Sequence, residues 1–167
     1  MNLKSYAIEL KWALIFTGMM LLWMLLEKLA GLHSEHIAQH ATFTNFVAIP
    51  AIGVYVLALL DKRKRFYGGS MTYLQGFVSG LIITLIVTVL SPVTQLITSL
   101  VISPEYFPNV IRYAVESGMM TQEQAEANFN LPNYLIQNAL FTPVMGLVTS
   151  ALVALFTQRK ARPKAAA

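Results

Sequence analysis

The stretch HSEHIAQH at residues 33–40 contains all three histidines of the chain: His33, His36 and His40. On a continuous helix, residues at i, i+3 and i+7 share a face, so the three imidazoles would point the same way. Together with Glu35, they are candidate ligands for zinc or copper. However, Gly31 weakens the case for a continuous helix, and carboxylates that would orient the ligands cannot be located from sequence. The alternative, three solvated side chains at a membrane surface, is favoured, so we expect no metal or cofactor.

A second set of polar residues follows a helical period within the apolar segment 72–102. Seven small or polar residues succeed one another at steps of three or four: Gly76, Gly80, Thr84, Thr88, Ser91, Gln95 and Thr98. Their start is a GxxxG motif, which is typical of closely packed membrane helices. Pro92 lies in the same segment and should free a backbone carbonyl near Thr88. Segment 133–157 repeats the pattern with Asn138, Thr142, Gly146 and Thr149.

These two stripes allow two interpretations. In the first, they are the surfaces along which the two segments pack against each other or against a second subunit. In the second, they line a path for water, an ion or a polar solute. Neither stripe contains an ionisable residue, although transport pathways usually contain one within the membrane. The sequence therefore favours packing.

The composition indicates the environment in which these residues lie. Of the 167 residues, 56% are hydrophobic and only 12% are charged, against about 25% charged in a typical soluble domain. The apolar residues form four blocks close to the length of about 20 residues that a helix needs to cross a bilayer. We therefore expect one all-α membrane domain over residues 1–167. Its predicted spans cover residues 12–30, 44–60, 72–102 and 133–157.

The basic residues predict how these spans are oriented. With four spans, ten of the twelve basic residues lie on the side of both termini: Lys4, Lys11, Lys62, Arg63, Lys64, Arg65, Arg159, Lys160, Arg162 and Lys164. The opposite side has Lys28 and Arg112, together with six of the eight acidic residues. Basic residues accumulate on the cytoplasmic side of membrane proteins. We therefore expect both termini, including the basic tail 158–167, in the cytoplasm of a bacterial inner-membrane protein.

The run DKRKR at 61–65 has a nucleic-acid interpretation and a membrane interpretation. Four basic residues directly after a span are what the predicted topology requires, and no nucleic-acid-binding motif accompanies them. The same charges attract anionic lipid headgroups. We therefore expect no nucleic-acid partner, and we expect headgroup contacts from Lys62, Arg63, Lys64 and Arg65.

Residues 103–131 form the one sizeable segment outside the predicted spans. Ser103-Pro104-Glu105 is a helix-start pattern, and Thr121-x-x-Gln124 is a capping-box pattern for a second helix. Gly118 is expected to end the first helix. Two short amphipathic helices resting on the bundle or on the outer headgroups are the favoured interpretation. The alternative is a docking surface for a partner.

No motif in the sequence indicates an enzymatic activity. There is no cysteine, Gly-rich phosphate loop, HExxH motif or G-x-S-x-G motif, and no pair of carboxylates lies within a span. We therefore expect no catalytic residues and no enzymatic activity.

The order of several motifs resembles a known family. GGSMTYLQGFVSG enters the third span, SPEYF follows it, GMMTQEQAEANF lies in the outer segment, and VMGLVTSALVALF lies in the fourth span. This order is similar to that of a bacterial family of small four-span inner-membrane proteins, the domain of unknown function 4199. The likeness covers roughly residues 5–160 and excludes HSEHIAQH. It implies a fold and a location but no activity and no site residues.

The sequence thus predicts a four-helix membrane bundle with a non-enzymatic structural or accessory role. We expect it to pack with itself, as a homodimer using the Gly76/Gly80 face or the Gly146 face, or with another membrane protein. The alternative function is a small channel or transporter that uses the polar stripe of the third span.

Overall fold

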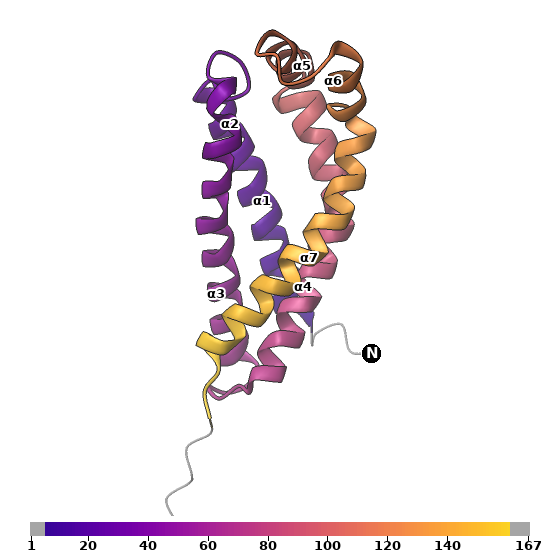
Figure 1. Ribbon diagram of the computed structural model, residues 1–167. Helices are drawn as coiled ribbons and strands as arrows, with labels where there is room; N and C mark the ends of the chain where they lie inside the picture. Colours follow the sequence, from indigo (N-terminus) through magenta and orange to yellow (C-terminus); the bar gives the residue numbers. More distant parts are fainter. Residues whose placement is uncertain (1–5, 161–167) are drawn as a thin grey trace, which may run out of the picture.

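The computed structural model describes residues 6–160, and over this range the chain is a bundle of four long helices with short helices at one end (Figure 1). The helices are α1 (Ala7–Leu29), α2 (Ile37–Phe43), α3 (Ala48–Arg65), α4 (Tyr73–Ile97), α5 (Tyr106–Glu116), α6 (Gln122–Asn128) and α7 (Leu131–Thr157). A 3₁₀ turn at Thr44–Val47 joins α2 to α3, and a π-helical turn at Thr98–Ile102 extends α4. Four helical stretches are long and apolar enough to cross a membrane. The predicted all-α class with four membrane spans is confirmed.

The first two spans are longer than predicted. Helix α1 begins at Ala7 instead of residue 12, because Glu9 is buried against polar partners inside the bundle. The second span runs from Ile37 to Arg65 instead of 44–60. Within it, the turn to 3₁₀ geometry comes just before Pro50, which has no N–H to donate to an α-helical bond. The extension places His40 on a helix.

The third and fourth spans begin close to the predicted residues. Thr72 caps α4 by a capping box with Gln75, and Asn130 caps α7 by accepting a bond from the Asn133 amide. Pro92 lies inside α4, as expected. The Ser91 hydroxyl donates to the Thr88 carbonyl at 2.9 Å, so the carbonyl that proline deprives of its helical partner is satisfied locally.

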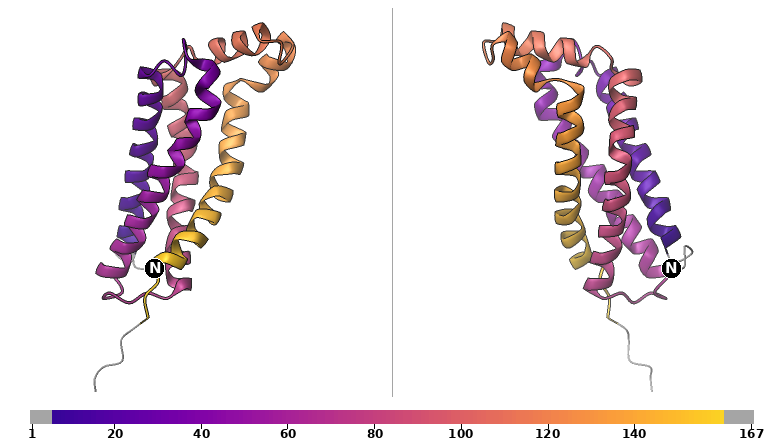
Figure 2. Two further views of the ribbon diagram at one scale, coloured as in Figure 1. Left: turned by 60° about the vertical axis from the view of Figure 1, so that its left-hand side comes forward. Right: turned by 90° about the vertical axis from the view of Figure 1, so that its right-hand side faces the viewer.

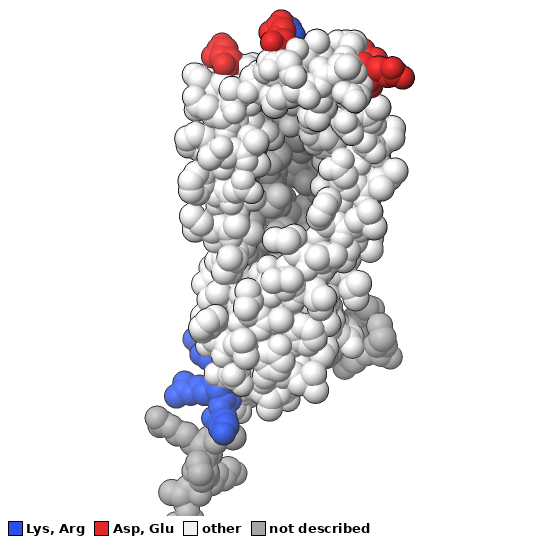
Figure 3. Space-filling model, viewed as in Figure 1, with Lys and Arg blue, Asp and Glu red and all other residues white. Residues whose placement is uncertain are grey.

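The two ends of the bundle carry opposite charge. The start of α1, the α3–α4 connection and the end of α7 lie together at one end, while α5 and α6 cover the other (Figures 1 and 2). In the space-filling view, Lys and Arg gather at the first end, and Asp and Glu gather at the second (Figure 3). We call these the basic end and the acidic end. Lys4 and residues 161–167 of the predicted basic tail lie outside the described residues.

The hydrophobic core lies in the half of the bundle near the basic end. It includes Ala13, Leu59, Ile83, Val153 and Ala154, which are all almost completely buried. Towards the acidic end, α7 stays beside α4 and diverges from α3 (Figure 1). A hollow opens between α3 and α7 in this half of the molecule (Figure 3). The bundle is thus tightly packed at the basic end and open at the acidic end.

The acidic end is covered by α5 and α6. Helix α5 begins at Tyr106 and buries Val110 and Ala114. Gly118 follows its end with a φ of 72°, a backbone conformation that favours glycine. The predicted capping box at Thr121 is present at the start of α6. The expected cap at Ser103 is not formed, because the Ser103 hydroxyl bonds to His33 instead.

Candidate functional site

The seam between α4 and α7 is closed in the half near the basic end. A Cβ atom added to Gly80 would lie 3.3 Å from the Ser150 Cα, and one added to Gly76 would lie 3.7 Å from the Ala154 Cα. A Cβ added to Gly146 would lie 2.9 Å from the Thr84 Cβ. At Gly80 and Gly146 the two helices therefore approach so closely that an added methyl group would clash, whereas at Gly76 it would make ordinary contact with Ala154. Gly146 meets Thr84, so the two predicted stripes touch at this point, while Gly76 and Gly80 meet Ala154 and Ser150.

The rest of the seam is joined by polar contacts. Asn138 Nδ2 donates to Gln95 Oε1 at 2.6 Å, and Gln95 Nε2 donates to Ser99 Oγ at 2.9 Å. The hydroxyls of Thr88 and Thr98 donate hydrogen bonds to backbone carbonyls of their own helix. Thr142 and Thr149 are half-buried along α7. The polar groups of the α4 stripe thus bond to neighbouring side chains or to their own backbone.

This arrangement changes the expected dimer surface. The Gly76/Gly80 face and the Gly146 face were the surfaces predicted for a second copy of the chain. Both are covered within the chain, since Gly76, Gly80 and Gly146 are buried against the opposite helix. A partner would have to use another surface.

A buried ion pair lies at the basic end, and the sequence interpretation did not identify it. Lys62 Nζ lies 2.8 Å from Glu9 Oε1, and both side chains are almost fully buried. The Ser79 hydroxyl donates to the same Glu9 carboxylate at 2.7 Å. Helices α1, α3 and α4 are therefore joined at one point. The available signal was Glu9 itself, the one acidic residue ahead of the first apolar block.

The basic residues of the run 61–65 lie in different environments. Lys62 departs from the expected headgroup contact, because it points into the bundle towards Glu9. Arg63 is half-buried and donates to the Thr157 carbonyl at 2.7 Å, which ties α3 to the end of α7. Lys64 and Arg65 are exposed. Only these last two have their side chains on the surface, where headgroups would be.

The second polar cluster is at the acidic end, where α1 turns into α2. Gly31 has a φ of 76°, and its carbonyl accepts bonds from the amides of Ser34 and His36. The chain therefore reverses in a turn and resumes as a helix only at Ile37. The three histidines therefore do not share one helical face, as the glycine at position 31 had indicated.

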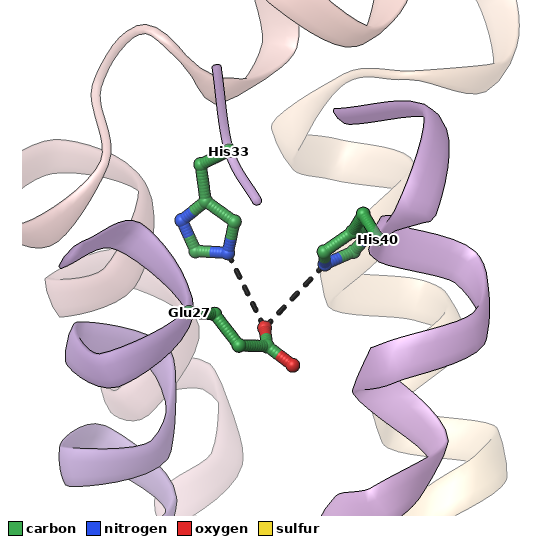
Figure 4. A group of neighbouring side chains, drawn as sticks. All are labelled: Glu27, His33 and His40. Carbon is green, nitrogen blue, oxygen red and sulfur yellow. Dashed lines mark hydrogen bonds and ion pairs between the residues drawn. The ribbon is translucent and has the colours of Figure 1, made fainter. Parts of the chain in front are cut away.

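The turn brings His33 and His40 together around Glu27 (Figure 4). The Glu27 Oε2 atom lies 3.3 Å from His33 Nε2 and 3.4 Å from His40 Nε2. The three ligand atoms all lie within 4.8 Å of one another. The side chains of Glu27 and His33 are only 2% and 6% exposed. His33 is thus buried, contrary to the expectation that all three histidines are solvated.

Neighbouring groups fix the orientation of these three side chains. His33 Nδ1 lies 2.6 Å from the Ser103 hydroxyl, and the His33 carbonyl accepts a bond from Asn109. The second oxygen of Glu27 accepts a bond from Trp23 Nε1 at 2.6 Å. These contacts leave Nε2 of His33 and one carboxylate oxygen pointing at the same small volume.

Tyr106 covers the cluster from α5. Its ring centroid lies 5.2 Å from the centroids of both His33 and His40. Its hydroxyl lies 3.4 Å from His40 Nδ1 and 3.2 Å from the Tyr134 hydroxyl. Burial raises the pKa of Tyr106 well above its usual range, and Tyr134 and Glu27 act in the same direction. The phenol therefore remains protonated and acts as a neutral hydrogen-bonding group.

His36 and Glu35 do not belong to the cluster. Both are exposed, and His36 Nδ1 lies 3.1 Å from the Ala30 carbonyl. Of the three histidines that the sequence offered as metal ligands, the structure brings two together and separates the third. The carboxylate that joins them, Glu27, comes from the end of the first span.

Comparison with known proteins found a matching family. The family model described as "Protein of unknown function (DUF4199)" matches residues 11–159. No curated protein and no solved structure matches the chain.

Proposed function

Because this chain belongs to the family of unknown function DUF4199, which has no activity to transfer, we propose from its own residues that it is a non-enzymatic structural or accessory protein. In this proposal it lies in the bacterial inner membrane and packs with a second copy or with another membrane protein. Its four apolar helices make it a multi-pass membrane protein.

The observation that carries the proposal is the closed seam between α4 and α7. Gly80 and Gly146 bring the two backbones into contact, and Gln95 and Asn138 bond to each other directly. A path along the stripe would need polar groups that face water. Here the two amides bond to each other, and the Thr88 and Thr98 hydroxyls bond to backbone carbonyls, as in packing between membrane helices. The seam therefore supports a structural role over the alternative of a channel or transporter.

Flux and mass measurements on the same proteoliposome or nanodisc samples test this proposal. We expect the wild-type chain and the Thr88→Leu and Gln95→Leu variants to conduct no ions or small polar solutes. Gln95→Leu should lower the apparent melting temperature, because Asn138 loses its partner across the seam, at a cost of about 1 kcal/mol. Val89→Leu, on the exposed side of α4, is the matched control and should change nothing.

The same samples give the number of copies. We expect a mass of two chains, with the contact made by exposed apolar side chains, since the glycine faces are covered. Wild-type flux that Thr88→Leu abolishes in a folded protein would support the channel instead. A single-chain mass in several detergents and in nanodiscs would contradict the dimer.

The proposed orientation places the basic end in the cytoplasm. It is supported by the separation of charge between the two ends (Figure 3), since basic residues are retained on the cytoplasmic side. Anionic lipid headgroups are then the expected partners of Lys64 and Arg65.

Single cysteines test this orientation well, because the natural chain has none. Glu123→Cys lies on exposed α6 at the acidic end, and Lys64→Cys is exposed at the basic end. We expect a membrane-impermeant maleimide to label Glu123→Cys in cells whose outer membrane has been opened. Lys64→Cys should react only after the inner membrane is permeabilised. The reverse pattern would invert the proposed topology.

A further inference from the structure

We propose that Glu27, His33 and His40 form a binding site for one divalent first-row transition cation of the zinc class. The site lies between the end of α1, the turn that follows it and α2 (Figure 4). This proposal goes beyond the structural role given above and does not depend on it.

The spacing of the ligand atoms matches tetrahedral coordination. Zinc bonds to histidine nitrogen and carboxylate oxygen are about 2.0–2.2 Å long, so adjacent ligand atoms of a tetrahedron lie roughly 3.3–3.5 Å apart. Glu27 Oε2 lies 3.3 Å and 3.4 Å from the two Nε2 atoms. Two edges of a coordination tetrahedron are therefore already present. The third edge, between the two nitrogens, is at most 4.8 Å long and would shorten when the cation binds.

The hydrogen bonds around the two imidazoles favour coordination through Nε2. When His33 Nδ1 donates to the Ser103 hydroxyl, its Nε2 carries a lone pair. His40 Nε2 likewise carries a lone pair when His40 Nδ1 donates its proton to the Tyr106 hydroxyl oxygen. Two nitrogen lone pairs and a carboxylate oxygen then converge on one point. A cation at that point resolves their repulsion, and the Ser103 contact is the type of outer hydrogen bond that orients a metal-binding histidine.

The type of ligand selects the class of cation. Imidazole suits zinc, copper, iron and nickel, whereas magnesium and calcium prefer sites made of oxygen atoms. Two histidines and one carboxylate leave a fourth position for water. A surface pocket bordered by Ser103, Glu105 and Tyr106 reaches His33 from solvent.

The site is also held in place without a cation. Its ligands come from separate elements, and Glu27 and His33 are buried and hydrogen-bonded to Trp23 and Ser103. A site that is already formed requires little ordering when the cation binds. We therefore expect binding to the folded protein without a large change in helix content.

The experiment is a titration of the purified full-length chain in nanodiscs with Zn²⁺, using an affinity tag that contains no histidine. Isothermal titration calorimetry gives the affinity, and elemental analysis after dialysis gives the metal content. We expect one zinc per chain in the wild-type protein. His33→Gln and His40→Gln should each bind about 100-fold more weakly. His36→Gln is the matched control, because His36 lies in the same turn but outside the cluster, and it should bind as the wild type does.

Further variants cover the case in which a histidine substitution prevents folding. Ser103→Ala leaves all three ligands in place but removes the group that orients His33, so it should weaken binding about 10-fold or more. With Co²⁺ in place of Zn²⁺, the wild-type protein should show the intense visible absorption of tetrahedral cobalt, and Glu27→Gln should lose or alter it.

Three results would overturn the proposal. The first is a folded wild-type chain that retains no zinc. The second is a loss of affinity in His36→Gln equal to that in His33→Gln, which would indicate binding at the exposed turn. The third is unchanged zinc binding in the variant lacking both His33 and His40. The first result would leave the cluster as a set of contacts between two imidazoles and a buried carboxylate.

Discussion

Replacing Lys62 by methionine is expected to destabilise the protein by about 3–5 kcal/mol, because it leaves the carboxylate of Glu9 buried without its cation. Glu9 and Lys62 are 1% and 3% exposed, so water cannot replace the lost charge. The Ser79 hydroxyl alone remains from the contacts described above. Thermal unfolding in detergent, followed by circular dichroism, should show a fall in the apparent melting temperature of about 10 °C or more.

Two comparisons make this result specific to the ion pair. Lys64→Met removes a basic residue two positions further along α3, where the side chain is exposed, and it should change stability by no more than about 0.5 kcal/mol. The double variant Glu9→Gln/Lys62→Met removes both buried charges and should recover much of the lost stability. If Lys62→Met and Lys64→Met melted together, the ion pair would not stabilise the bundle.

Replacing Gly146 by alanine is the second substitution with a large expected effect. The new Cβ would lie 2.3 Å from Thr84 Cγ2 and 2.9 Å from Thr84 Cβ. Rotation of the threonine side chain moves Cγ2 but not Cβ, so the helices must separate. The Thr84 hydroxyl also lies 2.8 Å from that of Tyr55, and this contact would be disturbed. We expect a loss of about 1–3 kcal/mol, measured as a melting temperature lower by about 5 °C.

Gly53→Ala is the matched control for this prediction. Gly53 lies within α3, but a Cβ at this position would meet nothing within 4 Å. Alanine favours a helix over glycine by about 1 kcal/mol, so this variant should be as stable as the wild type or more stable. Equal melting temperatures for Gly146→Ala and Gly53→Ala would contradict the close seam.

The membrane spans and the seam could be predicted from sequence because both depend on local, periodic patterns. A block of apolar residues specifies a span wherever it lies. Small residues at steps of four specify a helix surface that permits close approach, so Gly76, Gly80 and Gly146 were identified before their neighbours were known. The pattern did not show which helix would pack against this surface. Spacing along one helix does not distinguish a contact within the chain from one with a second copy.

The two charged clusters could not be predicted, because each joins residues that are distant in sequence or follow a turn. Glu9 and Lys62 are 53 positions apart, and no periodicity relates them. Glu27 and His40 face each other only because the backbone reverses at Gly31, which helical spacing cannot anticipate. The position of Lys62 at the end of a span suggested contact with lipid headgroups. In the bundle, Glu27 and Lys62 are instead turned inward by partners on neighbouring elements.

The pairing along the seam between α4 and α7 has a consequence for how the chain tolerates changes in length. Gly76 meets Ala154, Gly80 meets Ser150 and Thr84 meets Gly146, so each step of four residues forward along one helix is a step of four backward along the other. One residue inserted into either helix would rotate everything beyond it by about 100° and break this register. Insertions between α5 and α6, beyond the residues that contact His33 and His40, would leave the register intact. The connection between these two spans can therefore vary in length at that point, while the spans themselves cannot.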